Sequence, residues 1–123
     1  MTSKITWMAT ELGSYIDNHS TPPDPVQRRL IDTTADLGRL SMMQIGPNQG
    51  AFLEVLIGAL APKRCVEIGT FTGYSSLAIA RALGPEGHLI CCDVSEEWTA
   101  VAREHWDAAG VADKIDLLSL IHI

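Results

Sequence analysis

The stretch from Cys65 to Asp93, CVEIGTFTGYSSLAIARALGPEGHLICCD, decides the fold of this chain. Its first apolar run predicts a buried strand that ends in the loop Gly69 to Gly73. The periodic apolar residues that follow predict a helix ending near Gly84. A second apolar run, Leu89 to Cys92, predicts another strand that ends at Asp93. Strand, glycine turn, helix and strand together form the first half of a nucleotide-cofactor fold of the α/β class.

The ends of these two strands carry the candidate ligand-binding residues. Folds of this kind bind their ligand beyond the carboxyl ends of the strands, so we expect Glu67, Gly69 and Asp93 to converge on one crevice. Dinucleotide-binding loops need a glycine where this chain has Phe71, because the backbone there approaches a pyrophosphate. The sequence therefore favours an adenosine cofactor without a pyrophosphate, such as S-adenosylmethionine. We expect Asp93 to accept hydrogen bonds from both ribose hydroxyls.

Four motifs occur in order along the chain: MQIGPNQGAF at 43–52, VEIGTFTGYS at 66–75, CDVSEEW at 92–98 and AGVADKID at 109–116. Over residues 30–117 the sequence resembles the amino-terminal half of the bacterial caffeoyl-CoA and catechol O-methyltransferases. The resemblance implies a Rossmann-like class I methyltransferase fold with accessory helices at its amino terminus. It also implies methyl transfer from S-adenosylmethionine to a phenolic hydroxyl of a small catechol-type or hydroxycinnamoyl substrate.

Helical periodicity predicts three helices before the first strand, at about 3–17, 25–37 and 46–61. The third has a wide apolar face, which we expect to be buried against the sheet and which consists of Phe52, Leu53, Leu56, Ile57 and Leu60. We divide the chain into N-terminal helices at 1–61, the first half of a cofactor-binding domain at 62–117, and a tail at 118–123 that does not match the family.

Two residues before the third helix have two readings. From the residues alone, Met43 and Ile45 are core residues that lead into the helix. The resemblance implies instead that they border the methionine part of the cofactor. In the glycine loop, Gly69 permits close approach of the backbone to a ligand, and Thr70 and Ser75 offer hydroxyls nearby.

Three further residues flank the same crevice. Glu67 would be costly to bury unless it is paired or hydrogen-bonded, and either a cofactor ammonium or the loop amides would satisfy it. Val94 directly follows the ribose carboxylate and is predicted to contact either the adenine or the core. Trp98 could approach the same pocket, although a core position facing the sheet is the preferred prediction.

Composition excludes several classes of function. The chain has 123 residues and is acidic, with 15 Asp and Glu against 9 Lys and Arg, so nucleic acid is not an expected partner. No apolar stretch is long enough to span a membrane and no signal segment is present, so we expect a cytoplasmic protein. The three cysteines and four histidines lack the spacing of a metal or redox site and are interpreted as ordinary core or surface residues.

The resembling proteins are nearly twice as long. Their second half carries the Asp-Ala-Asp-Lys and Asp-Asn motifs that bind a divalent metal such as Mg²⁺, and they form homodimers. We therefore expect no catalytic residue and no metal ligand in this chain, weak or no cofactor binding, and no turnover. Residues 118–123 suggest an out-of-frame or adaptor-derived tail on a partial gene. In such folds the first strand lies in the middle of the sheet, so its edge would be open here and would invite self-association.

Two functions from different classes follow. The first is an S-adenosylmethionine-dependent O-methyltransferase, of which this chain is a fragment. The second is a non-catalytic protein in which the shortened domain serves as a binding or assembly module. A nicotinamide-dependent enzyme is less favoured than either, because Phe71 occupies the position of the required glycine.

Overall fold

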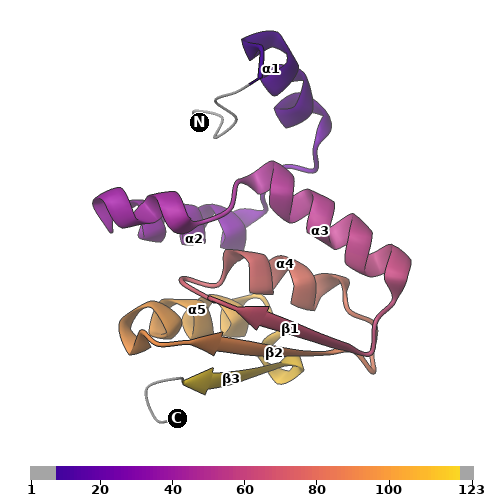
Figure 1. The fold of residues 1–123 in the computed structure, drawn as a ribbon, viewed down its shortest axis with the longest axis vertical. Coiled ribbons are helices and arrows are strands. Elements are labelled where there is room, and N and C mark those ends of the chain that lie inside the picture. Colours follow the sequence, from indigo (N-terminus) through magenta and orange to yellow (C-terminus); the bar gives the residue numbers. More distant parts are fainter. Residues whose placement is uncertain (1–7, 120–123) are drawn as a thin grey trace.

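The computed structural model describes residues 8–119, which form an α/β structure with a three-stranded parallel sheet (Figure 1). The strand order is β1-β2-β3. The elements are α1 (Thr10–His19), α2 (Pro25–Ala35), the 3-10 helix η1 (Gly38–Met43), α3 (Pro47–Leu60), β1 (Arg64–Ile68), α4 (Tyr74–Ala82), β2 (His88–Asp93), α5 (Glu96–Ala108), the 3-10 helix η2 (Ala112–Lys114) and β3 (Ile115–Ser119). The α/β class and the order of strand, glycine loop, helix and strand that the sequence predicts are confirmed.

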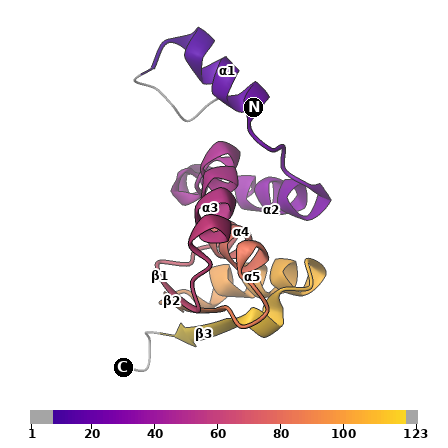
Figure 2. The same ribbon diagram turned by 90° about the vertical axis from the view of Figure 1, so that its right-hand side faces the viewer.

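The strands are in parallel register, so their carboxyl ends lie at one edge of the sheet. Ile68 of β1 pairs with Cys92 of β2, and Asp93 pairs with Ser119 of β3. The third strand runs to Ser119 and so extends past Leu117, where we placed the end of the cofactor-binding domain. Figure 2 shows α4 and α5 on one face of this sheet, and no helix of residues 8–119 lies on the other face.

The N-terminal helices form largely where the periodicity predicts them. Asp24 caps α2 by accepting a hydrogen bond from the Gln27 N–H at 2.9 Å, and the Gln27 side chain accepts from the Asp24 N–H in return. This reciprocal capping box fixes the start of the helix. The helix predicted at 3–17 appears as α1, which begins at Thr10, and residues 1–7 lie outside the described part. In Figures 1 and 2, α1 stands apart from the other helices.

The prediction that the wide apolar face of α3 is buried against the sheet is wrong. Phe52 and Leu60 are 61% and 66% exposed, and of this face only Ile57 is buried in the core. The helix packs on α4, which lies between α3 and the sheet in Figure 1. Gly50 explains the orientation, because a Cβ atom there would lie 2.8 Å from the ring of the buried Tyr74. The side of α3 that carries Gly50 and Ile57 therefore meets α4, and Phe52 and Leu60 face away.

The core lies between the sheet and the helices α2, α4 and α5. Leu30, Leu77, Leu89, Cys91 and Ala102 have no exposed surface. Cys91 is buried deeply enough that the pKa of its thiol rises to about 12, as expected for a small apolar core residue. Among residues 8–119, no helix has both the length and the apolar character needed to cross a bilayer.

Candidate cofactor site

The loop that joins β1 to α4 determines the shape of the site. It lies beside the carboxyl end of β2, where the Gly69 N–H donates to the Cys92 carbonyl at 2.8 Å. Three of its residues have left-handed backbone conformations: Gly69 at φ 88°, Phe71 at φ 52° and Gly73 at φ 88°. Such angles are strained for residues other than glycine, so Phe71 must be held by its surroundings.

Asp93 supplies that restraint. Its Oδ2 accepts a hydrogen bond from the Phe71 N–H at 2.7 Å, and its Oδ1 accepts one from the Ser95 N–H at 2.9 Å. The carboxylate thus ties the glycine loop to the start of α5. An ionised carboxylate has about four acceptor positions, so each oxygen keeps one position beyond these two bonds.

A cleft of about 350 Å³ opens at the ends of β1 and β2. It is lined by Met43, Ile68, Gly69, Phe71, Cys92, Asp93, Val94 and Trp98. The Phe71 and Trp98 rings meet edge to face at 5.1 Å, and Val94 is 57% exposed. Trp98 therefore forms a wall of the cleft, and its predicted position in the core facing the sheet is wrong. There the indole packs edge to face on the Phe71 ring of the glycine loop.

A smaller hollow of about 70 Å³ adjoins this cleft and shares Met43, Gly69 and Phe71 with it. Its lining also includes Gln44, Ile45, Thr70, Thr72, Gly73, Tyr74 and Ser75. The structure thus brings Met43, Ile45, Gly69, Thr70, Ser75, Asp93 and Val94, which the sequence selects, to two adjoining hollows. Of the selected residues, only Glu67 lines neither of them.

Glu67 lies directly behind the smaller hollow. Ser75 donates its hydroxyl to Glu67 Oε2 at 2.6 Å, and the Cys91 thiol lies 3.9 Å from Oε1. The carboxyl group is thus satisfied by a side-chain hydroxyl, not by the loop amides that we considered. Burial raises the pKa of Glu67 from 4.5 to about 7 against the lowering effect of these hydrogen bonds. Near neutral pH the group can therefore exist in either charge state.

A buried polar cluster, which sequence patterns do not predict, supports the loop. The hydroxyls of Thr34 and Thr72 lie 2.8 Å apart, and the Gln44 amide donates to Thr34 Oγ1 at 2.9 Å. All three side chains are buried. They join α2, the segment before α3 and the glycine loop. The only sequence signal is a polar residue at an otherwise apolar position, which does not reveal its partners.

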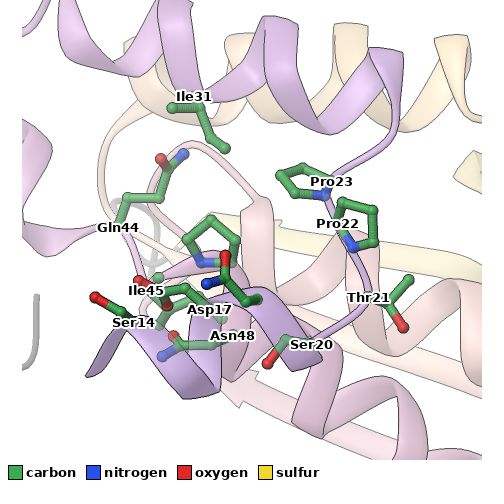
Figure 3. A pocket seen from close by; sticks show the side chains of 13 residues that line it. Ser14, Asp17, Ser20, Thr21, Pro22, Pro23, Ile31, Gln44, Ile45 and Asn48 are labelled. Carbon is green, nitrogen blue, oxygen red and sulfur yellow. The ribbon is translucent and has the colours of Figure 1, made fainter. Parts of the chain in front are cut away.

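A second, larger cavity of about 420 Å³ lies between α1, α2 and the segment before α3 (Figure 3). Its lining includes Asp17, Asn18, Pro22, Ile31 and Asn48, and it contains no Lys, Arg, His or Cys. This cavity shares Gln44 and Ile45 with the smaller hollow but has no lining residue at the strand ends, and its titratable lining is a single carboxylate. The cleft and the smaller hollow together are the better candidate site, because Thr70, Ser75 and Asp93 bring polar side chains there from three segments.

No group of three or more His, Cys, Asp or Glu side chains within residues 8–119 is arranged to hold a metal ion. The described residues therefore do not fit a divalent metal centre.

Comparison with known proteins identifies the family. The family profile described as O-methyltransferase matches residues 17–120, and the chain belongs to this family. It is 39% identical over 104 residues to a probable caffeoyl-CoA O-methyltransferase 2 of Dictyostelium discoideum, covering 85% of this chain and 45% of the relative. It is 30% identical over 108 residues to a catechol O-methyltransferase of Mycobacterium tuberculosis, covering 88% of this chain and 49% of that relative.

Solved structures agree with this assignment. The O-methyltransferase TomG of Streptomyces achromogenes, which was crystallised with S-adenosylmethionine, superimposes with a TM-score of 0.79 at 26% identity. The match covers 95% of this chain and 51% of TomG. The sheet and its helices are thus part of a Rossmann-like methyltransferase fold. The chain spans about half the length of the relatives that it matches.

Gly69 and Gly73 have the same φ of 88°, so substituting each in turn tests how the loop packs. A Cβ at Gly73 would lie 2.6 Å from the Ala102 Cβ, whereas a Cβ at Gly69 would meet nothing within 4 Å. We predict that Gly69→Ala costs about 1–2 kcal/mol of unfolding free energy from backbone strain alone. Gly73→Ala should cost about 1–3 kcal/mol more because of overpacking. Urea unfolding measures both values, and equal losses would contradict the described packing.

The raised pKa of Glu67 predicts how stability depends on pH. The folded chain holds a proton on Glu67 up to about pH 7, whereas the unfolded chain releases it near pH 4.5. This contribution to stability is therefore fully present below pH 4.5 and is lost as the pH rises through 7. Between pH 4.5 and pH 7, the free energy of unfolding of the wild type should fall by up to about 3 kcal/mol more than that of Glu67→Gln. The figure follows from 1.36 kcal/mol per pKa unit.

Denaturant titrations at pH 5 and pH 8 measure this difference. The matched control is Glu104→Gln, because Glu104 is exposed on α5 and the substitution should leave the pH dependence of the wild type unchanged. A Glu67→Gln protein with the same pH dependence as the wild type would show that Glu67 is ionised in the fold at both pH values.

Proposed function

We propose that this chain supplies an S-adenosylmethionine-binding site of an O-methyltransferase that acts on a catechol-type or hydroxycinnamoyl phenol. One observation carries the proposal: Asp93, at the end of β2, faces a glycine loop in which Phe71 stands where a pyrophosphate-binding loop needs glycine. The family membership and the S-adenosylmethionine bound to TomG support this cofactor. The relatives described above are named as enzymes, which favours an enzyme over a binding module.

The lining of the two hollows suits the separate parts of such a cofactor. The remaining acceptor positions of Asp93 would receive the two ribose hydroxyls. Val94 and Trp98 offer apolar surface for the adenine. The Ser75 hydroxyl, held by Glu67, lies at the smaller hollow, where it can meet the polar end of the methionine. When bound, S-adenosylmethionine supplies a methyl group on a positively charged sulfonium. The role of these residues is to orient it.

The methyl acceptor is proposed from the relatives alone. Their names refer to caffeoyl-CoA and catechol, so the acceptor is proposed to be a phenol of one of these kinds. No residue of 8–119 is assigned to the acceptor or to a metal. The division at residues 61 and 117, the homodimer of the full-length enzyme and the cytoplasmic location remain predictions.

The ribose contact can be tested by comparing ligands with and without the hydroxyls. Adenosine and 2′,3′-dideoxyadenosine are titrated into the 15N-labelled chain of 123 residues, and the amide signals of Phe71 and Ser95 are followed. We expect weak binding of adenosine and about tenfold weaker binding of the dideoxy analogue, because two charge-assisted hydrogen bonds are lost. In Asp93→Asn the two ligands should bind almost equally.

This comparison separates ligand contact from a structural effect. Asp93→Asn also weakens the hydrogen bonds to the Phe71 and Ser95 amides, so a general loss of affinity would not identify the ribose contact. A difference between the two ligands that persists in Asp93→Asn would contradict the ribose assignment. So would amide shifts confined to residues outside the cleft.

A further inference from the structure

The smaller hollow of the candidate site has two walls that come from distant parts of the chain. One wall is residues 43–45, which precede α3, and the other is residues 69–75, in the glycine loop and the start of α4. The space between them is only about 70 Å³. What fits there therefore depends on the contacts that hold the two walls at their present spacing.

Thr34 of α2 joins both walls without reaching the hollow. Its Oγ1 lies 2.8 Å from Thr72 Oγ1 in the glycine loop, and it accepts a hydrogen bond from Gln44 Nε2 at 2.9 Å. Gln44 and Thr72 line the hollow, whereas Thr34 does not and has no exposed surface. A ligand in the hollow would thus meet Gln44 and Thr72 but never Thr34.

The donors and acceptors of this cluster can be assigned. Thr34 has one hydroxyl hydrogen, which it donates to the Leu30 carbonyl at 2.7 Å. It can therefore only accept from Thr72 and from Gln44, so both of these side chains are donors. A Gln44 amide turned by 180° would bring its oxygen against an oxygen that has no hydrogen left to donate. Thr34 thus uses its one donor and both of its acceptor positions.

A valine at position 34 would keep the shape of threonine and remove all three hydrogen bonds. The buried donors of Gln44 and Thr72 would then lack an acceptor, which is costly unless they find another. Gln44 Nε2 already lies 3.4 Å from Thr72 Oγ1, so these two groups are the nearest replacement partners for each other. Closing that distance would draw the two walls together and narrow the hollow.

We propose that Thr34 is a positioning residue for the amino-acid end of S-adenosylmethionine, because it sets the spacing of the two walls through Gln44 and Thr72. This inference rests on the proposed function and assigns to the same site a residue that the ligand does not touch. In the proposed binding mode the adenosine part lies beside Asp93 in the larger cleft, whose lining includes neither Gln44 nor Thr72. Thr34 therefore acts on the amino-acid end and not on the adenosine.

A comparison of S-adenosylhomocysteine with adenosine tests this assignment. Only the first ligand carries the amino-acid chain, so the ratio of their dissociation constants reports on the hollow. Both are titrated into the 15N-labelled chain of 123 residues, and the amide signals of Ser75 and Val94 are followed. In Thr34→Val we expect about tenfold weaker binding of S-adenosylhomocysteine and a change of less than about twofold for adenosine. Thr34→Ser keeps the hydroxyl and should bind S-adenosylhomocysteine within about threefold of the wild type.

Thr99 of α5 provides the matched control. It is 7% exposed, and its hydroxyl donates to the Ser95 carbonyl at 2.9 Å, as the hydroxyl of Thr34 does to Leu30. Its bonds to Ser95 and Glu96 both stay at the start of α5. Thr99→Val therefore removes a comparable buried hydroxyl that joins no wall of the hollow. The ratio of the two dissociation constants should stay within about twofold of the wild type.

A measurement without ligand guards against misfolding. The side-chain amide protons of Gln44 should exchange slowly with solvent in the wild type and faster in Thr34→Val, while the backbone amides of β2 stay protected in both. Fast exchange of the Gln44 protons in the wild type would overturn the proposal, because the cluster would not be formed.

The titrations separate this inference from the proposed function. Unchanged binding of S-adenosylhomocysteine in Thr34→Val, or equal weakening of both ligands, would overturn the positioning role and leave the proposed function standing. So would the same change in ratio from Thr99→Val, or a failure of Thr34→Ser to restore binding. If S-adenosylhomocysteine does not shift the Ser75 amide of the wild type, the proposed function fails at this site and this inference fails with it.

Discussion

The carboxylate of Asp93 is the interaction on which the site depends. It is 7% exposed, and it joins the glycine loop to the start of α5 by accepting from the Phe71 and Ser95 amides. Hydrogen bonds to a charged group contribute about 1.5–3 kcal/mol each. This is comparable to the cost of about 1–2 kcal/mol for holding a residue such as Phe71 in the left-handed region. The same carboxylate therefore stabilises the strained loop and stands at the opening of the cleft.

The strained loop gives the cleft its chemical character. The ring of Phe71, which belongs to this loop, meets the Trp98 ring and makes one wall aromatic. The backbone at Gly69 stays open on the other side, where a ligand can approach closely. An apolar wall beside a carboxylate suits a nucleoside better than a pyrophosphate, whose charges would need amides and cations. The shape and chemistry of the cleft thus suit the proposed cofactor.

The sequence predicts most of what depends on local patterns. The order of elements from Cys65 to Asp93 follows from apolar periodicity and two glycines, and the start of α2 follows from the Asp24 cap. The orientation of α3 could not be predicted, because periodicity shows that a helix has an apolar face but not whether a partner is present. The contact between Gly50 and Tyr74, 24 residues apart, decides that orientation. Two further features also depend on contacts between segments, which no single stretch encodes. They are the hydrogen bond between Ser75 and Glu67 and the buried cluster of Thr34, Gln44 and Thr72.

The central claim is that adenosine binds at the strand ends beside Asp93. Isotope-filtered nuclear Overhauser measurements on the labelled chain with S-adenosylhomocysteine test it most directly. The account predicts contacts from the ribose and adenine protons to Gly69, Val94 and Trp98. Pro22 and Pro47 line the cavity beside α1. Contacts from the ligand to these two prolines, without contacts to Gly69, Val94 and Trp98, would contradict the claim.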